Sequence, residues 1–158
     1  EEYPIYSTVR IVVDPSALAE MLQRPYTMFG SDNVATSPEV AKETFNVLQA
    51  HPRNYGCFPH VLGNLVREEG ILTWEDAIRK MTSLPAQRFG LARRGLIREG
   101  MWADLVVFDS EQIGPRSTWR QPRLLPKGIH HVLVNGQFAV RDGEATGQRA
   151  GHVVRGFG

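Results

Sequence analysis

An acidic residue, Asp32, stands where the sequence could support chemistry. It closes the apolar run Tyr26–Asp32, which ends in Gly30, Ser31 and Asp32. This run predicts a buried strand with a carboxylate at its C-terminal tip, and in parallel α/β barrels the side chains at such tips face the catalytic mouth. A carboxylate there could bind a divalent metal ion or move a proton. The alternative is an Asp that caps the following helix, which the spacing alone favours.

A second polar group lies in the stretch 51–56, His-Pro-Arg-Asn-Tyr-Gly, which is predicted to be a loop near the same mouth. The planar fork of Arg53 suits a two-point contact with a substrate carboxylate, and a surface arginine is the alternative. His51 precedes a proline and is interpreted as structural rather than as a metal ligand. The remaining histidines are interpreted as carrying no function: His60, His130, His131 and His152.

Composition limits the classes of protein that this chain can represent. The 158 residues suffice for one domain with a core, and 42% hydrophobic and 22% charged residues argue against disorder. The net charge is +1 and the basic residues are scattered, so no nucleic-acid partner is expected. The single cysteine, Cys57, excludes an internal disulfide and a cysteine zinc cluster within the chain.

With no membrane span predicted, we expect a cytoplasmic protein without a membrane partner. Since residue 1 is not Met, we expect the chain to begin in mid-sequence or after processing.

The elements that must position these residues differ between two halves of the chain. A strand at 6–13, a helix opened by Asp14-Pro15 and the run to Asp32 have the order of a parallel α/β unit. Further helices are predicted after Ser37, along the apolar stripe 58–66, and from a capping box at Thr73. After about residue 90, a strand at 103–109, a hairpin with an Asn135-Gly136 turn and a second turn of similar kind at Asp142-Gly143 predict a small β module. We therefore expect two units, residues 1–90 and 91–158.

Several motifs occur in an order that resembles one family. They are Gly30-Ser31-Asp32, the stretch 51–56, Phe-Pro-x-Val-Leu-Gly at 58–63, Lys-Met-Thr-Ser-Leu-Pro-Ala at 80–86, Ala-Asp-Leu-Val-Val-Phe-Asp at 103–109 and Val-Asn-Gly at 134–136. The chain resembles the N-acyl-D-amino-acid deacylases (D-aminoacylases) of the metal-dependent amidohydrolase superfamily. The later motifs are common across that superfamily, and the first three point to D-aminoacylases.

The resemblance implies the C-terminal part of a (β/α)₈ barrel with zinc at its mouth, followed by a small β-sandwich-like module. It implies that Asp32 is the general base toward the attacking water, returns the proton to the leaving amine, and could also be a metal ligand. It makes Ser31 and Arg53 the candidate substrate-binding residues. The other metal ligands of the family have no counterpart in this chain, so we expect them upstream and expect no activity from this chain alone.

The resulting hypothesis is a part of a zinc-dependent enzyme that hydrolyses N-acyl-D-amino acids to a carboxylate and a free D-amino acid. Its expected partners are the upstream part of the same enzyme and the small-molecule substrate. One alternative is a cyclic amidase of the same superfamily, similar to dihydroorotase or hydantoinase. Another is a non-catalytic module that binds a partner through the surface that a barrel would cover.

Overall fold

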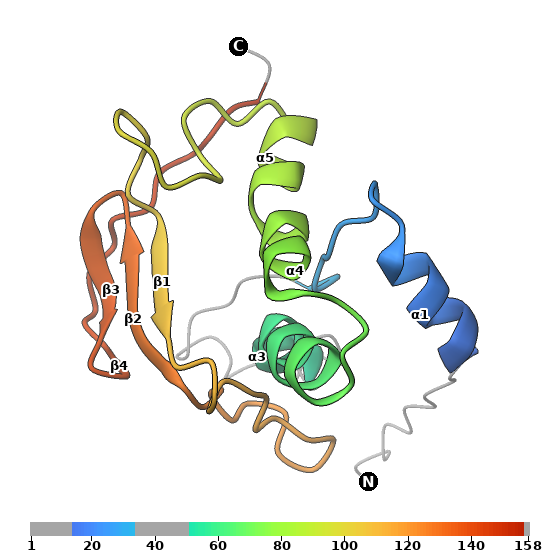
Figure 1. Cartoon of the computed structure of the whole chain (residues 1–158). Coiled ribbons are helices and arrows are strands. Elements are labelled where there is room, and N and C mark those ends of the chain that lie inside the picture. The colour runs from blue at the N-terminus through green and yellow to red at the C-terminus, as the bar shows by residue number, and fades with distance from the viewer. Residues whose placement is uncertain (1–13, 34–50, 157–158) are drawn as a thin grey trace, which may run out of the picture.

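The computed structural model describes residues 14–33 and 51–156. It places helices beside an antiparallel sheet (Figure 1). The helical elements are α1 (Pro15–Gln23), α3 (Arg53–His60), the π-helix η2 (Val61–Glu68), α4 (Trp74–Met81) and α5 (Ser83–Arg88). The strands are β1 (Leu105–Phe108), β2 (Ile129–Val134), β3 (Gln137–Arg141) and β4 (Glu144–Ala145), in the spatial order β1-β2-β3-β4. The strand predicted at 6–13 and the helix predicted after Ser37 lie outside the described residues.

The helix ends follow the local sequence. The Asp14 side chain accepts a hydrogen bond from the backbone N–H of Ser16 at 2.8 Å and caps α1. Thr73 accepts one from the backbone N–H of Asp76 at 3.2 Å and caps α4, as the capping-box pattern predicts. Gly70 follows η2 with φ +62°, a conformation that glycine adopts without steric cost.

Tight turns join β2 to β3 and β3 to β4, as predicted. Asn135 and Gly136 have φ 49° and 81°, and Asp142 and Gly143 have φ 52° and 81°. Positive φ at both central residues matches the right-handed twist of the flanking strands. The part of the chain that the structure describes contains this one sheet, so the second layer of a β-sandwich stays a prediction.

The two predicted units share one hydrophobic core. Its buried members are Val61, Leu62, Val66, Leu72, Ala77 and Ile113. All but Ile113 come from the helical half, while Ile113 follows β1 and is 1% exposed. The rings of Trp74 in α4 and Phe108 in β1 stack with centroids 6.0 Å apart. The division at residue 90 stays a prediction.

The α3 and η2 helices pack unusually close to the segment after β1. A Cβ at Gly63 would lie 2.5 Å from the carbonyl oxygen of Ile113 and 3.0 Å from Cα of Gly114, so only glycine fits here without a shift. Helix α3 begins at Arg53, earlier than the predicted stripe at 58–66, and contains Pro59. The prediction of a loop over 51–56 is therefore wrong for residues 53–56.

The prediction of a buried strand over Tyr26–Asp32 is also wrong for this structure. The segment begins in a turn at Tyr26 and belongs to no ladder within the described residues, and Tyr26 is exposed. Its backbone meets α4 through the N–H of Phe29, which donates to the carbonyl of Lys80 at 3.3 Å. A strand needs neighbouring strands for its hydrogen bonds, and an apolar composition alone does not supply them.

An ion pair within α4 has one fully buried partner, Lys80, which also connects α4 to α1. Lys80 is fully buried, pairs with Asp76 at 2.9 Å, and donates to the backbone carbonyl of Leu22. Arg79 also pairs with Asp76, at 2.8 Å. Burial of the Asp76 carboxyl favours its neutral form, but the hydrogen bonds and positive charges of Arg79 and Lys80 outweigh burial and hold its pKa below the ordinary value.

This pair generates a prediction about stability. In the full-length protein, Asp76→Asn should lower the free energy of unfolding by about 3 kcal/mol, because it leaves the buried ammonium of Lys80 without its counter-charge. Lys80→Met should cost less, since Asp76 keeps Arg79 and the Leu22 carbonyl keeps a hydrogen bond from Thr27 Oγ1 at 3.2 Å. Urea denaturation at neutral pH measures both variants, and a larger loss for Lys80→Met would contradict this account.

The same pair predicts a pH dependence. Because the folded state lowers the pKa of Asp76, the unfolded state binds the proton more readily, and the stabilisation is present above the ordinary carboxyl pKa of about 3.9. It should be lost as the pH falls through the lower pKa of the folded state. Unfolding free energies of wild type and Asp76→Asn between about pH 2.5 and pH 6 should converge toward the acid end. A constant difference across this range would count against the assignment.

Candidate functional site

The structure brings together two of the predicted site residues. Nη2 of Arg53, the first residue of α3, lies 3.0 Å from Oδ2 of Asp32. The Asp32 side chain is 88% exposed and its backbone has φ 48°, in the left-handed region. Ser31 precedes it and is half-buried. A proton acceptor and an anion-binding group therefore lie side by side.

His51 supports the start of α3. Its Nδ1 accepts a hydrogen bond from the backbone N–H of Arg53 at 3.1 Å, so the neutral ring carries its proton on Nε2. Burial lowers the pKa of His51, the charge of Arg53 lowers it further, and Asp32 opposes both. The ring is therefore neutral at pH 7 and keeps its acceptor, which agrees with the structural role interpreted from the sequence.

Cys57 lies on α3, one turn after Arg53. Its Sγ donates to the carbonyl of Gly30 at 3.8 Å, a weak contact that joins α3 to the segment ending in Asp32. Burial raises the pKa of this thiol, and the positive charge of Arg53 only partly offsets the effect. The thiol is therefore protonated at neutral pH and is not in the thiolate form that binds metal.

Sequence reasoning missed a second contact to this region, made by the loop between β1 and β2. Ser117 Oγ donates to the carbonyl of Pro52 at 2.8 Å. Trp119 meets the His51 ring edge to face, with centroids 4.5 Å apart and planes inclined by 64°. This loop contains prolines at 115, 122 and 126, which are typical of a loop, but no local signal in the sequence shows which residues it contacts.

An open, mostly apolar hollow of about 420 Å³ lies beside Arg53. It is lined by Leu18, Leu22, Phe29, Pro52, Arg53, Gly56, Cys57, His60, Val61, Leu65, Pro115 and Ser117. Nε of Arg53 is buried and has no hydrogen-bond partner in the part of the chain that the structure describes. The guanidinium therefore retains a donor that Asp32 does not use.

The described residues do not form a complete metal site. Within 14–33 and 51–156, no three His, Cys, Asp or Glu side chains gather where they could hold an ion. Asp32 could supply one oxygen ligand, but a catalytic zinc site requires about three protein ligands. The same ranges contain no helix with the length and apolarity needed to cross a bilayer.

Comparison with known proteins gives the family. The amidohydrolase family profile matches residues 8–140. The N-acyl-D-glutamate deacylase of Alcaligenes xylosoxydans xylosoxydans is 41% identical over 147 residues, which cover 93% of this chain and 28% of that protein. Dihydroorotase of Bacillus cereus (strain AH187) is 34% identical over 104 residues, which cover 63% of this chain and 23% of that protein. This chain therefore spans about 28% of the length of the deacylase that it matches.

Solved structures agree with the sequence match. A D-aminoacylase described as defining a subset of amidohydrolases superposes with a TM-score of 0.79 at 39% identity, covering 90% of this chain and 28% of that one. N-acyl-D-glutamate deacylase from Bordetella bronchiseptica, in complex with zinc and a phosphonate mimic of the tetrahedral intermediate, gives 0.69 at 39% identity over 84% of this chain and 27% of that one. With the profile match spanning most of its length, this chain belongs to the amidohydrolase family.

Proposed function

We propose that this chain is the C-terminal part of a zinc-dependent N-acyl-D-amino-acid deacylase. The reaction is hydrolysis of the amide bond to a carboxylate and a free D-amino acid. The observation that carries the proposal is the 3.0 Å pair of Asp32 and Arg53. Amide hydrolysis needs a proton acceptor, and a substrate with a free carboxylate needs a cation. The similarity to deacylases selects this reaction among those that such a pair could serve.

Asp32 is the proposed catalytic residue. Its carboxylate would take a proton from the attacking water and return it to the nitrogen of the leaving amine, since amide cleavage releases an amine that must be protonated. The high exposure of this side chain leaves room for water and substrate next to it.

Arg53 and Ser31 are the proposed substrate-binding residues. The Arg53 fork suits a two-point contact with the α-carboxylate of the substrate. Ser31 precedes the catalytic carboxylate, and its hydroxyl could donate to an oxygen of the substrate. The hollow beside Arg53 is lined mostly by apolar side chains, so it could pack against an apolar part of the substrate or of the full-length protein.

Zinc is the proposed cofactor, as in the deacylase structure that contains zinc. When bound, zinc polarises the amide carbonyl and lowers the pKa of water. Asp32 could contribute one ligand, and the others would come from outside the described residues. We propose that the upstream part of the same enzyme supplies them, together with the barrel strands beside the segment ending in Asp32 and the second layer of the β module. In this arrangement residues 1–90 belong to the barrel and 91–158 to the β domain of a cytoplasmic enzyme.

A cyclic amidase is the second candidate, because dihydroorotase matches 63% of this chain. The two functions differ in their substrates, an open N-acyl amino acid with a free carboxylate or a cyclic amide. Assays of the zinc-loaded full-length protein with N-acetyl-D-methionine, N-acetyl-L-methionine and dihydroorotate separate them. We expect hydrolysis of the D-isomer only, and turnover of dihydroorotate alone would overturn the proposal. A polypeptide of residues 1–158 should show neither zinc retention nor hydrolysis.

The first prediction for this reaction concerns the proton acceptor. Asp32→Asn in the full-length enzyme should lower kcat by at least about 100-fold, the low end for loss of a general base. Asparagine tolerates the left-handed backbone at this position, so the substitution removes charge without adding strain. Asp142→Asn is the matched control, since Asp142 has φ 52° and an 82% exposed side chain. Near-normal turnover of Asp32→Asn would remove Asp32 from the mechanism.

The second prediction concerns the carboxylate contact. Arg53→Lys keeps the charge but loses the fork, so KM for N-acetyl-D-methionine should rise about tenfold while KM for its methyl ester changes little. Arg24→Lys is the control, because Arg24 forms an ion pair with Glu20 on the surface of α1. Equal effects of Arg53→Lys on acid and ester would show that Arg53 does not meet the carboxylate.

A further inference from the structure

We propose that Trp119, on the loop between β1 and β2, is a positioning residue for Arg53. It would act through His51 and fix where Arg53 presents its guanidinium. This inference rests on the proposed function, because it assigns Arg53 to the substrate carboxylate. It extends that function by assigning a role to a residue outside the helix that carries Arg53.

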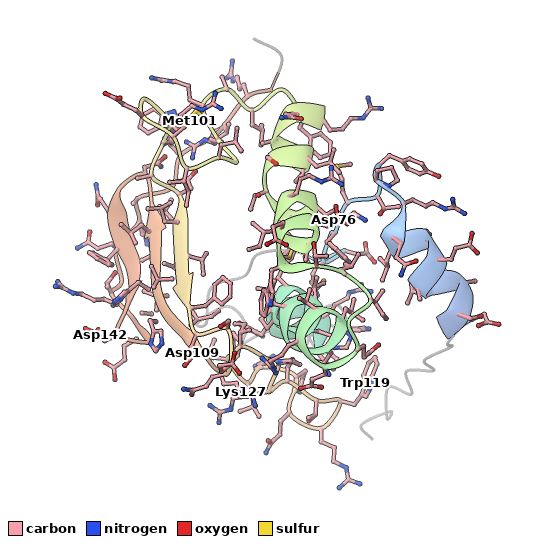
Figure 2. All side chains as sticks on the ribbon, viewed as in Figure 1. Asp76, Met101, Asp109, Trp119, Lys127 and Asp142 are labelled. Carbon is pink, nitrogen blue, oxygen red and sulfur yellow. The ribbon has the colours of Figure 1, made fainter. Side chains whose placement is uncertain are left out.

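The loop that carries Trp119 is anchored at its base. Backbone hydrogen bonds join Gly114 and Lys127, with N–O distances of 3.1 and 3.4 Å. Arg67 of η2 donates through Nη1 to the carbonyl of Ile113 at 2.6 Å. Figure 2 labels Lys127 at this base and Trp119 farther along the loop. The loop therefore leaves the sheet from a point tied to the same helical segment that bears Arg53.

The tip of the loop is closed as well. Thr118 and Gln121 exchange backbone hydrogen bonds of 3.1 Å in each direction, and Thr118 Oγ1 also accepts from the Gln121 N–H at 3.0 Å. Trp119 lies within this closed turn and is 57% exposed. Its ring contact with His51 links this turn to the residues that precede Arg53.

Three contacts join the loop to the residues on either side of Arg53. The Trp119 ring meets His51 at 4.5 Å, and Ser117 Oγ donates to the Pro52 carbonyl at 2.8 Å. A Cβ at Gly56, one turn into α3, would collide with Ser117 Oγ, so the loop and the helix are in close contact. His51 in turn accepts the backbone N–H of Arg53 at 3.1 Å. The loop thus contacts both the first turn of α3 and the two residues that precede it.

Loss of the loop contacts should affect binding of the substrate carboxylate and not proton transfer. A two-point contact depends on the orientation of the guanidinium plane, and misplacement of a binding group by about 1 Å can cost up to 100-fold. Asp32 lies on a different segment and, among the described residues, forms no hydrogen bond or ion pair with the loop. Loss of the Trp119 ring should therefore raise KM for the free acid and leave proton transfer by Asp32 in place.

The test uses the zinc-loaded full-length enzyme with N-acetyl-D-methionine and its methyl ester. Trp119→Ala should raise KM for the acid about fivefold to tenfold, with kcat within about threefold and the ester unaffected. Trp119→Phe, which keeps an aromatic ring against His51, should restore KM to within about twofold. Leu125→Ala, at a 59% exposed position of the same loop, should leave both substrates unchanged.

Two further measurements make the result decisive. The effects of Trp119→Ala and Arg53→Lys on KM for the acid should combine to less than their product, because both act on one contact. If Trp119→Ala does not fold, Ser117→Ala removes only the hydroxyl that binds Pro52 and should give the same selective rise. Equal changes for acid and ester, or independent effects of the two substitutions, would overturn the positioning role and leave the deacylase proposal standing. Absence of D-selective hydrolysis in the wild type would overturn both.

Discussion

The close approach of η2 to the backbone after β1 is the constraint on which much of this structure depends. At Gly63, any side chain would meet the carbonyl of Ile113 and Cα of Gly114. The missing Cβ lets Ile113 enter the core between Val61, Leu62 and Val66, where it is almost completely buried. Without this approach the sheet and the helices would present two separate apolar faces, each too small to exclude water alone. Because they share one core, the sheet and the helices have a fixed position relative to each other.

The core contact at Gly63 is connected to the proposed site through short segments of chain and a few hydrogen bonds. Ile113 and Gly114 begin the loop that carries Ser117 and Trp119, and Gly63 lies on the helical segment that continues from α3. Because the start of the loop is fixed against η2, the positions that the rest of the loop can take relative to α3 are limited. The hydrogen bond from Ser117 to Pro52 and the ring contact to His51 occur at that second meeting. A contact in the core thus determines the surroundings of an arginine near the surface.

The sequence predicted the parts of this structure that depend on local chemistry. The Thr73 cap and the turns at Asn135-Gly136 and Asp142-Gly143 require only side chains and φ values available within a few residues. The strand predicted over Tyr26–Asp32 does not form in this structure, because a strand depends on partners elsewhere in the chain. The pairing of Asp32 with Arg53 was not predicted, although each residue was singled out, because a distance between segments is a tertiary property. Trp119 was missed for the same reason, since an isolated exposed Trp has no pattern.

Two carboxylate–cation pairs in this chain show how burial separates a structural from an exchangeable interaction. Asp76 faces the fully buried Lys80, and breaking that pair strands a charge away from water, which costs several kcal/mol. Asp32 faces Arg53 with most of its own surface in solvent, and exposed pairs of this kind contribute only about 0–1 kcal/mol. A substrate carboxylate could therefore replace Asp32 on Arg53 at little cost, because the displaced carboxylate is already hydrated. For the proposed function such a weak pair is an advantage, since the same exchange would both occupy the arginine and release Asp32 to act as the base.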